Sequence, residues 1–448
     1  MTATEAAQPA GTLSSESADH VPSTTGEKRV RVPAIDGFRG YAAIAVLLFH
    51  VTYAAGRPPL DEGIIRNVLI SGYMGVDFFF VISGFLLFLP AVTNGGRLGD
   101  LRSYALRRAA RIIPAYYLLL VGVVVLHSVI VNIPTALPHT SLRGVLSFFL
   151  HLTFLQHTIG LLLGIPEGFA IQGAVWTLTL EALFYVLLPL VAGWYFRHPL
   201  VGLAAALAVS ALWKYAAIHV PFSVSWLAGG DRDSLRLMLV TQLPTYAAHF
   251  AAGMTGAWLF VKLRSVNARA IPAGAVLAQA LALIVIILSM RSAGIRDLRR
   301  VGGLYTDASG RWYYDHWTDT TYVALAFAVL LVATALAPRW GRWPVTNRVA
   351  RFLGDASYGV YLWHLVVIGF AFQTLNFAPD RTGLAFVRML TVTLVASLIA
   401  GWLSFVSVER PFIRWARRRS RRREQPSATV APPQPAQVPA VPHRGAHW

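Results

Sequence analysis

The stretch Ala34-Ile-Asp-Gly-Phe-Arg-Gly-Tyr-Ala-Ala-Ile-Ala-Val-Leu-Leu-Phe-His50 is apolar and close to the length that a helix needs to cross a bilayer. Its charged or readily ionised residues are Asp36, Arg39 and His50. At roughly 100° per residue these three fall on one stripe of a helix, with His50 about 16 Å farther along the axis than Arg39. Ionisable groups within a span are costly unless they face a partner or a wet cavity, so the stripe predicts the wall of a cavity or tunnel. Taken singly, Asp36 and Arg39 are also compatible with an interfacial ion pair, and His50 with a helix-capping or interfacial histidine.

Apolar stretches of this kind recur along the whole chain. Of its 448 residues 55% are hydrophobic and only 13% are charged, whereas soluble domains carry roughly 25% charged residues. We therefore expect an all-α fold, a polytopic transmembrane helical bundle of about ten spans with one re-entrant or interfacial segment. The expected spans lie near 35–55, 68–92, 112–133, 174–196, 199–219, 237–262, 271–290, 321–338, 352–374 and 383–408.

Basic residues predict the orientation of these spans. They gather in short loops between the apolar stretches and in a final run from Arg410 to Arg423. The positive-inside rule places such clusters in the cytoplasm. A further apolar stretch near 145–165 would send the later clusters outside if it crossed the membrane, so we expect it to be re-entrant or interfacial. The prediction is a multi-pass protein of the plasma membrane with both termini cytoplasmic.

Composition also excludes several classes of function. The net charge of +18 lies in membrane-flanking clusters, which anionic lipid headgroups satisfy, so no nucleic-acid partner is expected. The chain has no cysteine, which excludes disulfides and thiolate metal sites. We expect a disordered cytoplasmic tail over 1–33, a transmembrane domain over 34–415, and a basic, then Pro/Ala-rich, disordered tail over 416–448.

Two further motifs place charge near or inside apolar runs. Asp77 lies in Gly75-Val-Asp-Phe-Phe-Phe-Val-Ile-Ser-Gly84 and needs a partner, for which His50 or a loop arginine is a candidate; a packing hydrogen bond is the alternative. Gly84 shares the face of Asp77 and would let another helix approach. Arg108 and Arg111 lie at i, i+3, and paired guanidinium groups suit a phosphate-rich ligand. A positive-inside anchor is the simpler interpretation of these arginines.

Two later spans carry polar groups as well. Glu181 lies too deep in its apolar run for a purely interfacial role. Ser357, Tyr361 and His364 form one polar stripe at i, i+4, i+7. Taken alone, His364 is better interpreted as a structural histidine than as a catalytic one. The chain shows no metal-ligand spacing, phosphate loop or serine-hydrolase elbow, so neither a metal nor a bound cofactor is expected.

Taken in order, these motifs resemble the acyltransferase 3 family of bacterial membrane-bound O-acyltransferases, and the resemblance covers about 35–415. The matching motifs are Asp36-Gly-Phe-Arg-Gly with His50, Gly75-Val-Asp-Phe-Phe-Phe-Val-Ile-Ser-Gly-Phe, Arg108-x-x-Arg111-Ile-x-Pro114, Trp176-Thr-Leu-x-x-Glu181-x-x-Phe-Tyr, Ser357-Tyr-x-x-Tyr361-Leu-x-His364 and Glu409-Arg-Pro.

The resemblance implies about ten transmembrane helices, an acyl-CoA co-substrate entering from the cytoplasm (acetyl-CoA is the expected form), and a hydroxyl-bearing glycan or glycolipid acceptor. His50 matches the essential histidine of the family, Arg39 its motif arginine, and Arg108 with Arg111 its functional arginine pair. Glu181 and His364 match motif positions of less defined role. Some relatives carry an additional C-terminal SGNH-type domain, and only a short tail is expected here after Arg423.

The resulting hypothesis is that Arg39, Arg108 and Arg111 bind the acyl-CoA donor. His50 acts as general base on the acceptor, or carries the acyl group itself. Asp36 or Asp77 would orient His50, and Glu181 joins them as a candidate catalytic residue. One alternative acceptor is a cytosolic small molecule such as a macrolide. An alternative of another class is a polytopic transporter, whose charged stripe would form a proton or substrate path.

Overall fold

A computed structural model of the chain describes residues 32–56, 63–126, 142–164, 173–221, 223–224, 232–266, 270–298, 311–377 and 382–424. These residues belong to one contact unit, which begins at Val32. The expected N-terminal tail falls outside them up to residue 31, as does the end of the chain beyond residue 424.

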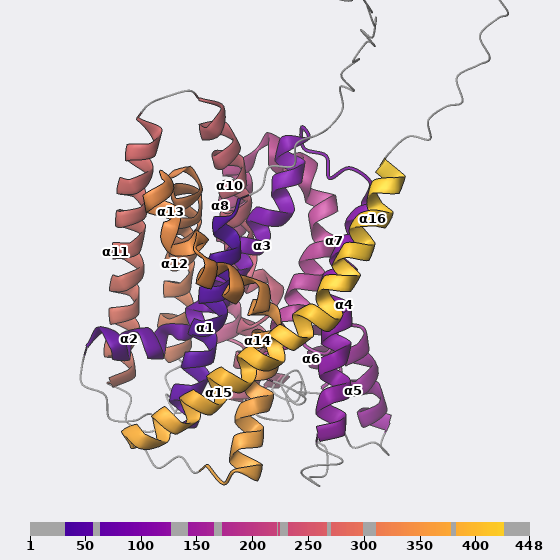
Figure 1. The fold of residues 1–448 in the computed structure, drawn as a ribbon, viewed down its shortest axis with the longest axis vertical. Helices are drawn as coiled ribbons and strands as arrows, with labels where there is room; N and C mark the ends of the chain where they lie inside the picture. The colour runs from indigo at the N-terminus through magenta and orange to yellow at the C-terminus, as the bar shows by residue number, and fades with distance from the viewer. Residues whose placement is uncertain are drawn as a thin grey trace, which may run out of the picture. The chain divides into compact units, whose positions relative to one another are not determined.

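Within the described residues the fold consists of helices and their connections, without strands (Figure 1). The first half contains α1 (Ala34–Ala54), α2 (Ile64–Ile70), η1 (Ser71–Tyr73), α3 (Met74–Thr93), α4 (Leu101–Val125), α5 (Leu142–Leu152), α6 (Thr158–Leu162), α7 (Trp176–Arg197) and α8 (Pro199–Ile218). The second half contains α9 (Arg232–Val240), η5 (Leu243–Tyr246), α10 (Ala247–Ser265), α11 (Ile271–Leu298), α12 (Arg311–Leu336), α13 (Arg339–Thr346), α14 (Arg348–Thr374), α15 (Gly383–Ser404), η6 (Phe405–Glu409) and α16 (Arg410–Glu424).

The chain is a multi-pass membrane protein with an all-α fold, as the sequence predicted. Among the described residues, eight helical runs are long and apolar enough to cross a membrane, and the bent pair of α12 and α13, with an angle of 116°, makes a ninth if it counts as one span. One expected span, near 237–262, has no counterpart among these nine. It corresponds to α10, which does not meet the same criterion of length and apolarity. Because α10 packs against α3, α8 and α12 and is largely buried by them, it needs less apolar surface than a helix that faces lipid.

The doubtful stretch near 145–165 forms two short helices, α5 and α6, of 11 and 5 residues. At about 1.5 Å per residue neither is long enough to cross the hydrocarbon. The expectation that this stretch is not a membrane span is therefore confirmed.

The C-terminal boundary differs from the prediction. Helix α15 continues through the π-helical turn η6 into α16, so that Gly383–Arg423 is one helical run, which crosses the bundle diagonally in Figure 1. The expectation of a disordered tail from residue 416 is wrong for residues 416–424. One face of α16, which includes the buried side chains of Ala416 and Ser420, packs against α4, and that packing supports a helix too basic to be stable alone.

Helices α1 and α14 form a close central pair that positions the site. A Cβ atom at Gly354 of α14 would overlap the carbonyl oxygen of Asp36, and one at Gly40 would approach the backbone of Gly354 to 2.8 Å. Glycine at both positions thus lets the two backbones touch, as small residues do in membrane helix pairs. Farther along the two helices, Leu47 and Val51 pack in a core cluster with Val360 and its neighbours.

Candidate active site

His50 lies in the last two turns of α1, and two neighbours fix its ring orientation. Its Nδ1 atom is 2.9 Å from the carbonyl oxygen of Val46 and 3.2 Å from Nε2 of His364. A carbonyl oxygen can only accept, so Nδ1 of His50 carries the proton. In the neutral ring the lone pair is then on Nε2, which is the atom able to take a proton from a substrate.

His364 on α14 is buried and faces His50, with the two ring centroids 4.9 Å apart. Its own Nδ1 lies 2.8 Å from the carbonyl oxygen of Tyr361, so this nitrogen is also protonated in the neutral ring. The remaining lone pair, on Nε2, faces the Nδ1–H of His50. The structure thus brings together two residues from motifs at opposite ends of the chain.

Asp36 and Arg39 lie at the other end of α1, and both are half-buried. Because α1 is an uninterrupted helix, they share a stripe with His50 as expected. Along the axis, however, Asp36 is about 21 Å and Arg39 about 16 Å from His50. The hypothesis that Asp36 orients His50 is therefore wrong, since a carboxylate must touch a ring nitrogen to orient it.

The other members of the polar stripe on α14 have defined partners. The hydroxyl of Tyr361 donates to the carbonyl oxygen of Ala174 at 3.1 Å and lies 2.9 Å from Oγ1 of Thr177. Ser357 donates to the carbonyl oxygen of Gly354 at 2.7 Å, within its own helix. Tyr361 therefore ties α14 to the start of α7, whereas Ser357 is satisfied locally.

Glu181 on α7 accepts two hydrogen bonds through one carboxyl oxygen. Its Oε1 is 3.1 Å from the hydroxyl of Ser83 on α3 and 2.7 Å from that of Tyr185, one turn along α7. Arg108 and Arg111 act electrostatically on Tyr185, as Glu181 does. The carboxyl group thus lies near the arginine pair of α4 and at a different level of the bundle from His50.

The two arginines of α4 have different surroundings. The guanidinium of Arg108 lies over the ring of Tyr104, 5.8 Å from its centroid, and the buried Nε of Arg108 has no hydrogen-bond partner among the described residues. Arg111 acts electrostatically on the buried carboxyl of Glu409, which accepts from Ser404 at 3.3 Å. An unsatisfied guanidinium donor is a suitable contact for a phosphate oxygen.

These groups follow one another along the bundle. The hydroxyl of Tyr358 on α14 donates to the carbonyl oxygen of Ile112 on α4, one turn beyond Arg108. His364 lies six positions after Tyr358. The axial separation from Arg108 to the His50–His364 level is therefore about 15 Å. The arginine pair and the histidine pair thus lie at different depths of the bundle, and we call these two pairs, with Glu181 and Glu409, the polar path.

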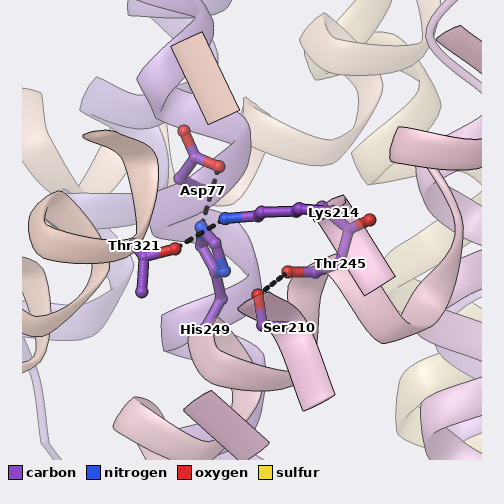
Figure 2. Close-up of polar contacts among 6 residues, drawn as sticks. All are labelled: Asp77, Ser210, Lys214, Thr245, His249 and Thr321. Atoms are coloured by element: carbon purple, nitrogen blue, oxygen red, sulfur yellow. Dashed lines mark hydrogen bonds and ion pairs between the residues drawn. The ribbon is translucent and has the colours of Figure 1, made fainter. Parts of the chain in front are cut away.

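Asp77 has a partner that the sequence analysis did not consider. Its Oδ1 lies 3.1 Å from Nε2 of His249 on α10, and both side chains are buried (Figure 2). The amine of Lys214 on α8 points toward this pair and donates to Thr321 on α12 at 2.6 Å. The sequence analysis expected His50 or a loop arginine as the partner of Asp77. Both expectations are wrong, because the partner is His249. Gly84, on the same helix, lies against the carbonyl oxygen of Phe250, which confirms the close helix approach expected there.

The comparison with known proteins decides the family. A family model described as an acyltransferase domain (acyltransferase 3) matches residues 32–406, most of the chain. The chain belongs to the acyltransferase 3 family. The described bundle is accordingly a membrane-embedded acyltransferase domain, and the polar path lies within the matched region except at Glu409.

Three relatives illustrate the range of this acyltransferase family. A putative peptidoglycan O-acetyltransferase of Bacillus subtilis (strain 168), YrhL, is 24% identical over 389 residues, 85% of this chain and 54% of that protein. The peptidoglycan O-acetyltransferase OatA of Listeria monocytogenes is 26% identical over 404 residues, with 87% and 57% covered. A putative O-acetyltransferase of Staphylococcus aureus (strain COL) is 24% identical over 416 residues, with 87% and 58% covered. The chain thus spans just over half the length of these relatives. No solved structure matches it significantly.

Several polar residues of this acyltransferase domain were not predicted from sequence. His249 and Lys214 lie within predicted spans, so the rule that singled out Asp77, an ionisable group inside an apolar run, would have found both. Tyr185 and Thr177 lie in the motif of Glu181 but look like ordinary residues of a span. Their hydrogen bonds to Glu181 and Tyr361 become visible only once the helices are packed.

Proposed function

We propose that this protein transfers an acetyl group from acetyl-CoA to a hydroxyl of a carbohydrate or glycolipid. Membership of the acyltransferase 3 family supports acyl transfer. Two relatives carry the name peptidoglycan O-acetyltransferase, one of them as a putative assignment, and these names support acetyl as the group and a carbohydrate as the acceptor class. The donor is inferred from the chemistry of the polar path.

The observation that carries this proposal is the orientation of His50. With Nδ1 held by Val46 and His364, the Nε2 lone pair is available as a general base. His50 takes the proton of the acceptor hydroxyl as its oxygen attacks the thioester carbonyl. The carbon–sulfur bond then breaks, and the departing thiolate receives the proton from His50. The products are an ester and free CoA, and the histidine returns to its starting state.

The arginine end of the path suits the donor. Coenzyme A carries a pyrophosphate and a ribose phosphate, and guanidinium groups bind phosphate oxygens through charge-assisted hydrogen bonds. Arg108 has an unsatisfied buried donor, and Arg111 lies one turn farther along α4. The pantetheine arm, an extended chain with two amide units, spans a distance of the order of the axial separation between this end and His50. Glu181 accepts hydrogen bonds from Tyr185 and Ser83, and we place this group beside the pantetheine arm.

We infer that the arginine end faces the cytoplasm, where acetyl-CoA is made. Helix α16, which carries the run of arginines, packs against α4, and its Arg423 acts electrostatically on Asp100 at the start of α4. The positive-inside rule favours the cytoplasm for this end and for both termini, in the plasma membrane. His50 then lies toward the opposite face, which favours an envelope acceptor over a cytosolic molecule such as a macrolide.

The acceptor is tested by mass spectrometry of envelope glycans and glycolipids from cells with and without the gene. The proposal expects one carbohydrate species to lose an acetyl mass on deletion and to regain it when the wild-type gene is returned. Unchanged acetylation of every envelope species, together with acetylation of an added macrolide by the same cells, would overturn the carbohydrate assignment.

A further inference from the structure

We propose that His364 is the positioning residue of His50, in the place that a carboxylate holds in a serine-hydrolase triad. This inference deepens the proposed function and rests on it for its catalytic consequence. It begins from the contact between Nδ1 of His50 and Nε2 of His364 at 3.2 Å. His364 is fully buried, so water does not compete for this contact.

The direction of this hydrogen bond follows from the backbone. Tyr361 presents a carbonyl oxygen to Nδ1 of His364, and Val46 presents one to Nδ1 of His50. Both oxygens accept only, so each Nδ1 is a donor, and Nε2 of His364 is left as an acceptor. His50 therefore donates from Nδ1 to His364, and His364 stays neutral. Two carbonyl groups from two helices thus set the tautomers of both rings.

The carboxylates of the neighbouring motifs do not compete for this role. Asp77 is paired with His249, and Asp36 lies about 21 Å from His50 along α1. A neutral imidazole also costs less to bury in a membrane bundle than an ionised carboxylate does. Using a histidine as the orienting acceptor gives the base a fixed tautomer without a buried charge.

The consequence for the reaction is specific. When Nε2 of His50 takes the hydroxyl proton, the ring becomes an imidazolium whose Nδ1–H is shared between His364 and Val46. The acceptor on His364 stabilises that cation until the proton passes to the thiolate. His364 itself neither gains nor loses a proton, and it touches no reacting atom. Its loss should therefore lower the rate of the chemical step and leave donor binding unchanged.

A matched pair of variants tests the role in the full chain. In His364→Gln the side-chain amide keeps an oxygen that can accept from His50, whereas His364→Met has a similar length and no strong acceptor. We expect kcat to fall about 100-fold in His364→Met and less than about 10-fold in His364→Gln, with KM for acetyl-CoA unchanged in both. Equal losses in the two variants, at unchanged thermal midpoints, would overturn the assignment.

A spectroscopic readout separates this inference from the proposed function. Nitrogen-15 spectra of wild-type protein with labelled histidine report which ring nitrogen of His50 is protonated, with the signal assigned by its loss in His50→Asn. The inference expects a protonated Nδ1 that shifts in His364→Met and is retained in His364→Gln. A protonated Nε2 in the wild type would overturn it. If the purified protein used no acetyl-CoA, the proposed function would fail, and these spectra would still decide the position of His364.

Discussion

Oδ1 of Asp77 and Nε2 of His249 lie 3.1 Å apart, and both side chains are buried between α3 and α10. Lys214 on α8 is 3% exposed and acts electrostatically on both residues. Figure 2 shows the amine of Lys214 pointing toward this pair, so we expect the positive charge of Lys214 to balance the negative charge of Asp77. Removing one charge leaves the other uncompensated in a membrane bundle, which is far more costly than removing both.

Replacing one charge of this cluster should destabilise the fold. For Asp77→Asn or Lys214→Met we expect a loss of about 3 kcal/mol, because each leaves a buried charge without its counter-charge. The double variant Asp77→Asn with Lys214→Met should regain most of that stability. The thermal midpoint of each protein in detergent measures the effect. If the loss of stability in the double variant equals the sum of the two single losses, the two charges are not coupled.

The contact between α1 and α14 predicts a large effect from a single methyl group. Gly354→Ala would place a Cβ atom on the carbonyl oxygen of Asp36, so the helices must separate, at a cost of about 1–3 kcal/mol. Separation would also move His364 away from His50 and lower activity. Gly369→Ala on the same helix is the control, since a Cβ there meets no atom within 4 Å. It should raise stability by roughly 0.5–1 kcal/mol. Equal thermal midpoints for the two variants would contradict this account of the helix contact.

The arginine end predicts a binding defect. Arg108→Gln should raise KM for acetyl-CoA roughly 10- to 100-fold and leave kcat nearly unchanged, because a charge-assisted hydrogen bond is worth about 1.5–3 kcal/mol. Steady-state kinetics with acetyl-CoA measures both constants. Arg102→Gln is the matched control, as Arg102 lies on the same helix and is exposed. A similar KM for both variants would indicate that Arg108 only anchors the helix at the membrane surface.

The long helices were predictable from sequence because a helix that crosses the bilayer needs a continuous run of about 20 apolar residues, and such runs are visible in the sequence. The expected spans 174–196 and 352–374 correspond to α7 and α14. Helix ends were less predictable. Helix α4 begins at Leu101, eleven residues before the expected span 112–133, because Asp100 accepts hydrogen bonds from the backbone of Arg102 and Ser103 and caps a basic first turn. A basic turn of this kind is polar, so a search for apolar runs does not detect it.

The sequence singled out His50 and His364, but not the contact between them. Spacing along one helix placed Asp36, Arg39 and His50 on one stripe, and α1 bears this out. Which residue touches His50 depends on which helices are neighbours, and hydrophobic periodicity carries no record of that order. His50 and His364 are 314 positions apart, and a carboxylate was the expected partner.

The central claim is that His50 acts as the base in acetyl transfer from acetyl-CoA, and its most direct test uses purified full-length protein in detergent. The measurement is the release of free CoA thiol and the appearance of acetyl ester on added envelope glycan, for the wild type and for His50→Gln. We predict a steady reaction with the wild type and a rate at least about 1,000-fold lower with the variant at an unchanged thermal midpoint. Detergent removes every transmembrane gradient, so a transporter would show no reaction at all. Full activity of His50→Gln, or no reaction with the wild type, would contradict the account.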